Sequence, residues 1–216
     1  DNAASMSERT GAAAYSSLSQ ALVEGSFDAV DLMLPHDLHK EAAIEAFGAG
    51  KHVLLEKPMA SDLASCERIM EAAELANTVF MVAEQAQYWP DIKRARDLID
   101  AGQIGEVVTA RACFYDPLPV NATKDDGVPW RFSLARAGGG ICIDGGAHWI
   151  RPLRMLLGEV SEVIATMGSH IPNMEGESWV RALMLFDSEI TASFEALLSG
   201  GVVGPTEDFR ITGTSG

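Results

Sequence analysis

Residues 28–83 alternate between short apolar runs and helix-forming segments, and this alternation constrains the fold more than any other feature of the sequence. The apolar runs are 28–34, 52–55 and 78–83, and the segments rich in helix formers are 40–47 and 61–77. Strand, helix, strand, helix, strand is the pattern of a parallel sheet with right-handed crossovers. We therefore expect the first part of the chain to form a parallel α/β sheet.

The helix expected at 61–77 has a candidate cap and an apolar stripe. Ser61 is placed to cap its first turn. The spacing puts one set of apolar residues on a single face, namely Leu63, Cys66, Met70 and Ala73. This face is expected to pack against the sheet.

The second part of the chain has a different pattern. A helix is expected over 91–101, ending at Gly102, and a long β-prone segment follows at 107–115. Further strands are expected at 160–167, 180–186 and 190–198, and residues 210–216 resemble a strand that runs into a turn. Strands without intervening helices favour antiparallel pairing, so we expect an α+β domain with a largely antiparallel open sheet. The domain boundary is expected near residue 90, giving domains 1–90 and 91–216.

Charge and cysteine content indicate which partners and which compartment to expect. Lys and Arg number 16 against 31 Asp and Glu, a net charge of −15, which argues against nucleic acid and against an anionic membrane surface. No apolar run approaches the ~20 residues of a membrane span. The three cysteines are far apart and form no CxxC motif, which fits a reducing cytoplasm. The glycosylation sequon Asn121-Ala122-Thr123 is interpreted as a chance match.

Lys57 is the first candidate for chemistry. It follows an expected parallel strand in Glu56-Lys57-Pro58, and ligands of open α/β sheets bind beyond the carboxyl ends of such strands. Pro58 restricts Lys57 to extended backbone angles, so that the ammonium projects from a fixed base. The alternative is a surface lysine in a turn.

The glycine-rich stretch from Gly138 to His148 holds the second candidate. If the chain is helical from Asp144 onward, Asp144 and His148 are four residues apart and share a face. A carboxylate and an imidazole on one face suit proton transfer, because histidine titrates near neutrality and an acidic neighbour can orient its ring. The alternative is a local cap beside a partly buried histidine.

Two further groups of residues allow simpler explanations. His36 and His39 follow the first strand, but no third ligand is evident, so a lining or capping role is favoured and no metal site is expected. Trp130 and Arg131 fall in a loop, where each could be simple packing or a solvated charge.

Taken in order, these segments resemble the Gfo/Idh/MocA oxidoreductases, the glucose–fructose oxidoreductase and inositol dehydrogenase family. Pro35-His36-Asp37-Leu38-His39 is similar to the family's Pro-x-x-x-His segment, and residues 50–58 to the segment that ends in Glu-Lys-Pro. Residues 83–90 resemble the stretch where members usually carry Glu-Asn-x-Arg. Trp130-Arg131 and the Gly138–His148 stretch complete the pattern, which covers nearly the whole chain.

The resemblance implies a nicotinamide-binding Rossmann domain followed by a substrate and oligomerisation domain. It implies that Lys57 is the catalytic lysine and that Asp144 and His148 are the substrate-side pair. The implied contacts to NAD or NADP come from the strand ends and the loops, and they are Leu34, Pro35, His36, His39, Glu56, Lys57, Gln85, Trp130 and Arg131. The implied reaction is reversible hydride transfer with a sugar, polyol or cyclitol as substrate, in a protein that forms a homo-oligomer at full length.

The chain departs from the family pattern at several points. Gln85 stands where asparagine is usual, and Arg151 where many members have a second aspartate. We expect the glycine fingerprint to lie upstream of Asp1 and the closing strands beyond Gly216, so that this piece lacks both ends and binds dinucleotide poorly.

Two alternatives and one choice of roles stay open. The first alternative is a non-catalytic dinucleotide-binding sensor of the same fold, and the second is a lyase or hydrolase that uses bound NAD as a transient oxidant. Within a dehydrogenase, His148 suits the base, Lys57 the electrostatic and proton-relay partner, and Asp144 the orienting carboxylate. The roles of Lys57 and His148 could be exchanged.

Overall fold

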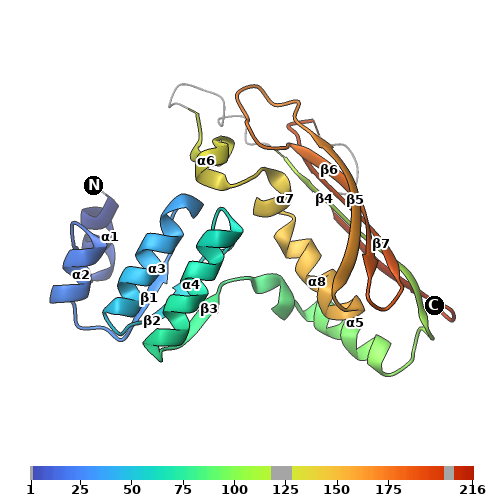
Figure 1. Ribbon diagram of the computed structural model, residues 1–216, viewed down its shortest axis with the longest axis horizontal. Coiled ribbons are helices and arrows are strands. Elements are labelled where there is room, and N and C mark those ends of the chain that lie inside the picture. The colour runs from blue at the N-terminus through green and yellow to red at the C-terminus, as the bar shows by residue number, and fades with distance from the viewer. Residues whose placement is uncertain (1, 118–127, 202–206) are drawn as a thin grey trace. The chain divides into compact units, whose positions relative to one another are not determined.

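The chain forms two compact units, whose helices and strands are shown in Figure 1. The N-terminal unit comprises residues 1–34 and 38–83, and the C-terminal unit comprises 35–37 and 84–216. This computed structural model describes residues 2–117, 128–201 and 207–216, so the sequon at Asn121 lies outside the described residues. Within those ranges, no helix combines the length and the apolar character that crossing a membrane requires.

The N-terminal unit contains the expected alternation of strands and helices. Its elements are α1 (Asn2–Thr10), α2 (Leu18–Glu24), β1 (Ala29–Leu32), α3 (His39–Gly48), β2 (His52–Leu55), α4 (Leu63–Ala76) and β3 (Phe80–Val82). The sheet has the order β1-β2-β3 with both pairings parallel, and Leu32 is paired with Leu55 and Leu55 with Val82. The prediction of a parallel Rossmann-type sheet is confirmed.

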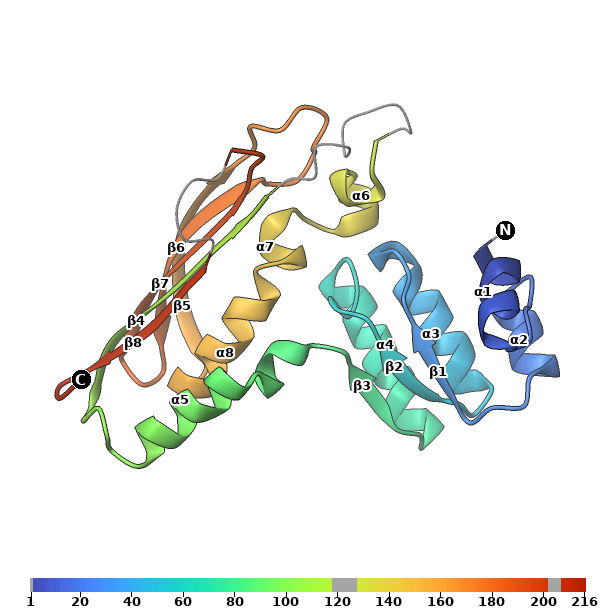
Figure 2. The same cartoon turned by 180° about the vertical axis from the view of Figure 1, so that it is seen from behind.

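Helices α3 and α4 pack against the same side of this sheet, as Figures 1 and 2 show from opposite directions. The core consists of apolar residues from the strands and both helices, including Ala43, Ala46, Leu55 and Ile69, each with no exposed surface. Small alanines on α3 let the helix approach the strands closely. Both crossovers therefore bury one face of the sheet.

For α4, the expected cap was wrong and the expected apolar face was right only in part, at Cys66 and Ala73. The N-cap is Asp62 rather than Ser61, and its carboxylate accepts a hydrogen bond from the Ser65 amide at 2.8 Å. Aspartate caps a helix about as well as serine, and here it lies in the position that reaches the third amide of the helix. The buried face centres on Ile69 and Ala73, whereas Leu63 is 81% exposed and Met70 is 42% exposed.

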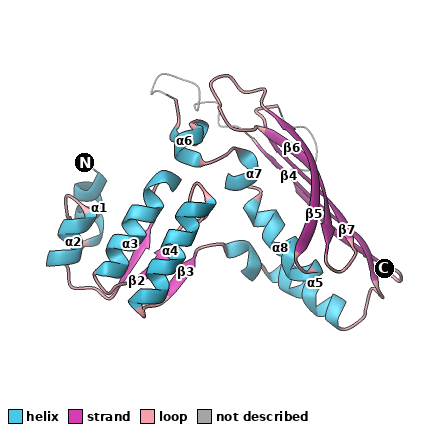
Figure 3. Cartoon of the chain, in the orientation of Figure 1, coloured by secondary structure: helices cyan, strands magenta, loops and turns pink. Residues whose placement is uncertain are grey.

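The C-terminal unit combines short helical segments with a long-stranded sheet, a contrast with the N-terminal unit that Figure 3 makes visible. The 3₁₀ segment η1 (His36–Leu38) contributes its first two residues to this unit. The remaining elements are η2 (Gln85–Tyr88), α5 (Pro90–Asp100), β4 (Val107–Asp116), η4 (Trp130–Phe132), α6 (Leu134–Ala137), α7 (Ile141–Asp144), α8 (Ala147–Leu157), β5 (Val160–Gly168), β6 (Trp179–Phe186), β7 (Thr191–Leu198) and β8 (Glu207–Gly213).

The sheet of the C-terminal unit has the order β5-β6-β7-β4-β8. Three of the four pairings are antiparallel, as the sequence predicted. The exception is β4 with β7, which run parallel from Thr109 beside Thr191 to Asp116 beside Leu198. A parallel pair needs a long connection, and the helices and strands between β4 and β7 provide it.

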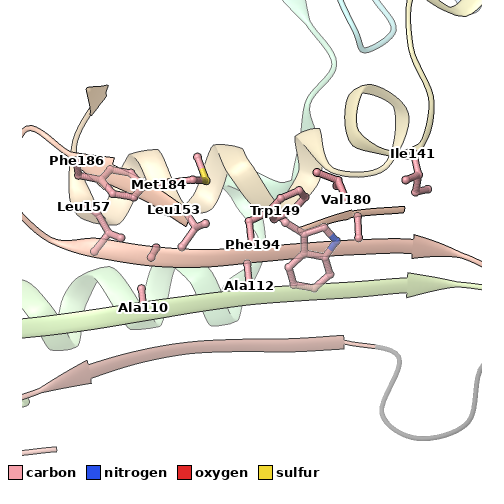
Figure 4. Close-up of a cluster of buried hydrophobic side chains, with 12 residues drawn as sticks. Ala110, Ala112, Ile141, Trp149, Leu153, Leu157, Val180, Met184, Phe186 and Phe194 are labelled. Carbon is pink, nitrogen blue, oxygen red and sulfur yellow. The ribbon is translucent and has the colours of Figure 1, made fainter. Parts of the chain in front are cut away.

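Helix α8 packs against one face of this sheet and carries the core of the unit. Figure 4 shows Trp149, Leu153 and Leu157 of the helix directed at apolar side chains of the strands. Leu153 has no exposed surface, and the Trp149 ring stacks on Phe114 with centroids 6.0 Å apart. This packing fixes the first turn of α8, which contains His148.

Candidate functional site

In the N-terminal unit, the candidate residues follow the carboxyl ends of β1 and β2. The parallel register places Leu32 beside Leu55, so the segments that follow these strands leave the same edge of the sheet. Leu34, Glu56 and Lys57 are each half-buried there. The Glu56 carboxylate accepts a hydrogen bond from the Lys57 amide at 2.9 Å, and the Lys57–Pro58 bond is cis.

His39 connects these two segments. Its ring is fully buried, with Nε2 2.9 Å from the carbonyl oxygen of Leu34 and Nδ1 2.9 Å from that of Pro58. The side chain therefore holds the loop after β1 against the loop after β2. Because the ring exposes no surface, we interpret His39 as shaping this edge, and its direct contact with a cofactor stays a prediction.

In the C-terminal unit, His148 has a carboxylate partner that its sequence neighbourhood does not suggest. Its Nδ1 lies 2.8 Å from Oε1 of Glu84, and both side chains are largely buried, at 19% and 13% exposure. The same Glu84 oxygen accepts a hydrogen bond from the Ala86 amide at 2.9 Å. The Trp89 ring lies beside the imidazole, with centroids 6.4 Å apart.

Asp144 belongs to a second group of contacts. Its Oδ2 lies 2.9 Å from Nε of Arg131, whose guanidinium lies over the Trp130 ring at 4.4 Å. The Trp130 ring meets the edge of the buried His36 ring at 4.7 Å, and His36 Nδ1 lies 2.8 Å from the carbonyl oxygen of Ala137. Four residues singled out from the sequence thus form one connected chain.

Asp144 and His148 do not share one continuous helix, contrary to the conditional expectation. Helix α7 ends at Asp144, α8 begins at Ala147, and Gly145 and Gly146 form the turn between them. Both glycines are closely packed, because a Cβ on Gly146 would overlap the carbonyl of Cys142 and one on Gly145 would overlap the Phe114 ring. The two functional residues are therefore placed by two separate helical segments.

Glu177 fixes the start of α7. Its carboxylate accepts hydrogen bonds from the amides of Gly140 and Cys142, each at 2.9 Å, and its main-chain carbonyl accepts one from Ile141 at 2.9 Å. A Cβ at Gly140 would overlap the Glu177 carbonyl, so this close approach requires glycine. Burial, with a smaller effect from the Glu177 charge, raises the pKa of the Cys142 thiol to about 11.

A cavity of about 360 Å³ lies within the C-terminal unit beside this turn. Its polar lining side chains are Asp116, Arg131 and Asp144, and its apolar wall includes Phe132, Ile141, Met174 and Leu198. Burial, with a smaller effect from the Asp144 charge, raises the pKa of Asp116. Among the described lining residues, two carboxylates and one guanidinium stand beside apolar side chains, and they can bind hydroxyl groups, which both donate and accept hydrogen bonds.

The structure thus brings together some of the predicted residues and leaves others apart. Within the C-terminal unit, Asp144 joins Arg131, Trp130 and His36, while the described lining of the cavity includes Asp144 and Arg131 but not His148. Lys57 belongs to the N-terminal unit, and its convergence with the other two catalytic candidates stays a prediction. Gln85 is exposed at the start of η2.

Sequence reasoning did not assign three further acidic residues to the site: Glu84, Asp116 and Glu177. Glu84 follows β3 and Asp116 ends β4, so the strand-end rule that singled out Lys57 could have found Glu84. Nothing in the sequence marks Glu177, which is 37 residues from Gly140.

Comparison with known proteins extends over the whole chain. Residues 1–84 match the family model described as "Oxidoreductase family, NAD-binding Rossmann fold", and residues 92–216 match "GFO/IDH/MocA C-terminal domain". Levoglucosan dehydrogenase of Pseudarthrobacter phenanthrenivorans is 34% identical over 143 residues, covering 66% of this chain and 36% of the relative. The scyllo-inositol 2-dehydrogenase (NADP(+)) of Bacillus subtilis is 31% identical over 187 residues, covering 86% of this chain and 54% of the relative.

Structural comparison agrees with these relatives. Levoglucosan dehydrogenase solved in complex with NADH and levoglucosan superposes with a TM-score of 0.87 and 28% identity, covering 99% of this chain and 59% of that one. The chain spans about a third to a half of the length of the two curated relatives named above. Both family models match in the expected order and together cover nearly every residue, so the chain belongs to the Gfo/Idh/MocA family of oxidoreductases.

Proposed function

We propose that the protein catalyses reversible hydride transfer between a nicotinamide cofactor, NAD or NADP, and a hydroxyl-bearing carbon of a sugar, polyol or cyclitol. The observation that carries the proposal is the carboxylate-bound imidazole of His148, placed one short turn from Asp144 at the cavity wall. A hydroxyl that becomes a carbonyl must lose its proton as the hydride leaves, so the reaction needs a base beside the reacting carbon. The named relatives include enzymes for levoglucosan and scyllo-inositol.

Three residues of the chain have separate roles in the proposed reaction. His148 accepts the hydroxyl proton, and the Lys57 ammonium stabilises the charge that develops on the substrate oxygen. Asp144, held by Arg131, faces the cavity and accepts hydrogen bonds from substrate hydroxyls. This replaces our sequence-based expectation that Asp144 orients the His148 ring, because Glu84 makes that contact. When bound, the nicotinamide supplies the acceptor or donor of the hydride.

The residues of both units suit a dinucleotide. In the N-terminal unit, the segments after β1 and β2 leave the same edge of a parallel sheet, where nucleotide ligands of such folds bind. We assign Leu34, Glu56 and Lys57 to this cofactor surface, and His39 to the shaping of it. From the C-terminal unit we assign Gln85, the Trp130 and Arg131 pair, and the segment that contains Pro35 and His36.

We also propose the domain limits, the compartment and the partners of the protein. We propose partial domains at 1–90 and 91–216, a cytoplasmic protein without a nucleic-acid or membrane partner, and a homo-oligomer at full length. The charge of −15 and the absence of a CxxC motif support the choice of compartment and partners.

A substrate panel tests the proposal. The full-length protein is incubated with levoglucosan, scyllo-inositol or D-xylose and with NAD or NADP, and formation of the reduced nicotinamide is followed by its ultraviolet absorbance. We expect turnover with at least one pair, and a loss of about 10²–10⁴-fold in kcat for His148→Gln, because the variant removes the base. Binding of the dinucleotide without turnover would favour the sensor alternative. Substrate conversion that leaves the cofactor unchanged would favour the lyase or hydrolase.

A further inference from the structure

We infer that Glu84 is the positioning residue that selects the tautomer of His148, so that Nε2 is the atom that accepts the substrate proton. This inference rests on the proposed function for its chemical meaning. It favours His148 over Lys57 as the proton acceptor, a choice that the sequence left open. It stands on the contact between Glu84 and His148 and on the second hydrogen bond that Glu84 accepts.

The donor and acceptor in the contact are defined by Glu84. Its Oε1 accepts a hydrogen bond from the Ala86 amide at 2.9 Å, and as an ionised carboxylate Glu84 only accepts hydrogen bonds. Nδ1 of His148, 2.8 Å from the same oxygen, must then be the donor. A neutral imidazole carries one proton, and with that proton on Nδ1 the lone pair is on Nε2.

The surroundings hold both partners in place. Both side chains are largely buried, which favours a fixed ring over an exchanging one. The segment η2 that begins directly after Glu84 packs against α8, the helix of His148. A second contact joins the same two elements, because Arg151 Nη2 donates to Gln87 Oε1 at 3.0 Å. The Trp89 ring lies beside the imidazole, with centroids 6.4 Å apart.

The arrangement assigns two functions to one carboxylate. Glu84 holds the proton on Nδ1 and stabilises the positive charge that the ring acquires when Nε2 takes the hydroxyl proton. The proton moves from the substrate oxygen to Nε2, the hydride leaves with its electron pair for the nicotinamide, and the carbonyl forms. A ring protonated on Nε2 would present a donor to the hydroxyl and could not act as the base.

The first experiment reads the tautomer directly. Nitrogen NMR of uniformly labelled protein, at a pH well above the ordinary histidine pKa of about 6.5, distinguishes the protonated from the bare ring nitrogen, and His148→Gln identifies the signals. We expect His148 in the wild type to be protonated on Nδ1. In Glu84→Gln the amide oxygen still accepts from Ala86 and from Nδ1, so the tautomer is retained. In Glu84→Leu the Nδ1 proton has no acceptor at this position. The population of the tautomer protonated on Nε2 is therefore expected to increase.

Kinetics of the same variants provide the second readout. Glu84→Gln is expected to lower kcat about 10–100-fold, by analogy with the loss seen when the hydrogen-bond partner of a metal-bound histidine is altered. Glu84→Leu is expected to lower kcat about 10²–10⁴-fold, the contribution of a positioned base. KM for the substrate is expected to stay within a few-fold of wild type for both, because neither change removes a side chain that lines the cavity.

Asp62→Leu is the matched control. Asp62 is also a carboxylate that caps a helical segment, through the Ser65 amide, but it lies in the N-terminal unit and is not assigned to the site. This control should leave both the tautomer and kcat unchanged. A wild-type ring protonated on Nε2, or a Glu84→Leu variant with unchanged tautomer and kcat, would overturn the inference. An Nδ1-protonated wild type that reduces no cofactor with any substrate would instead overturn the proposed function.

Discussion

The two units differ in the polar contacts around their candidate residues. In the N-terminal unit, His39 binds two main-chain carbonyls and thereby fixes the path of the backbone after β1 and β2. In the C-terminal unit, His36 likewise binds a main-chain carbonyl, but Glu84 contacts the side chain of His148 and the more exposed Arg131 contacts that of Asp144. The first arrangement shapes a surface of the N-terminal unit, and the second orients groups of the C-terminal unit that can exchange protons. We propose that the N-terminal unit contributes mainly to binding, with Lys57 as its chemical contribution, and that the C-terminal unit contributes the proton acceptor.

The largest expected effect concerns the separate cores of the two units. Leu153 on α8 and Ile69 on α4 are both fully buried, each in its own cluster. Leu153→Ala and Ile69→Ala should each cost about 2–5 kcal/mol of stability, through lost burial and the cavity left behind. Hydrogen exchange resolved by peptide should show faster exchange in the C-terminal unit for the first variant and in the N-terminal unit for the second.

Leu75→Ala serves as the control for these cores, because the Leu75 side chain is 88% exposed and its loss should change little. Equal destabilisation of both units by either core variant would show that the two cores unfold together. The two units could then not be treated as independently stabilised.

The next effect in size tests the chemical contribution of the N-terminal unit. Lys57→Met keeps much of the side-chain volume and removes the charge. In the full-length protein it should lower the rate roughly 10²–10³-fold, because the ammonium stabilises an oxygen whose charge grows in the transition state. Lys57→Arg should not restore the rate, since a guanidinium stays protonated and cannot share a proton. Steady-state kinetics with cofactor titration should show dinucleotide affinity changed far less. Normal turnover by Lys57→Met would leave the N-terminal unit a purely binding element.

A smaller effect distinguishes the two candidate caps of α4. Asp62→Ala removes the acceptor for the Ser65 amide and should lower stability by about 1 kcal/mol. Ser61→Ala should lower it by much less, because Asp62 occupies the N-cap position. Urea unfolding of the two variants checks the order. A larger loss for Ser61→Ala would restore the sequence-based choice of cap.

The smallest expected effect is a pH dependence at Asp116. Its pKa is raised in the folded state by burial and by the Asp144 charge, so ionisation at neutral pH disfavours folding. Asp116→Asn should therefore stabilise the protein near pH 7, by less than about 1 kcal/mol because the group is partly solvated. The gain should disappear as the pH falls below the unfolded value of about 3.9, where both states are protonated. Thermal unfolding of Asp116→Asn and wild type from pH 3 to 7 measures this gain in stability. Asp97→Asn, at an exposed position, is the control. A gain that persists at low pH would show that ionisation of Asp116 is not the cause of the stabilisation.

The fold could be predicted from the sequence to a large extent, and the site only in part. The strands of the N-terminal unit are short apolar runs whose neighbours along the chain are also their neighbours in space, so the local pattern suffices. The parallel pair β4 and β7 depends on a long connection, and no local pattern shows it. The same limit applies to the site. Asp144 and His148 were found by their spacing, whereas the partner of His148 is 64 residues away.

In the proposed reaction, a hydride moves from a substrate carbon to the nicotinamide while His148 takes the proton. This transfer is measured most directly with a substrate of the panel deuterated at the reacting carbon, by mass spectrometry of the cofactor recovered after turnover. We predict one deuterium in the reduced nicotinamide, at a rate that falls about 10²–10⁴-fold in His148→Gln. Product formation with no deuterium in the cofactor, or deuterium transfer at an unchanged rate in His148→Gln, would contradict the proposed reaction.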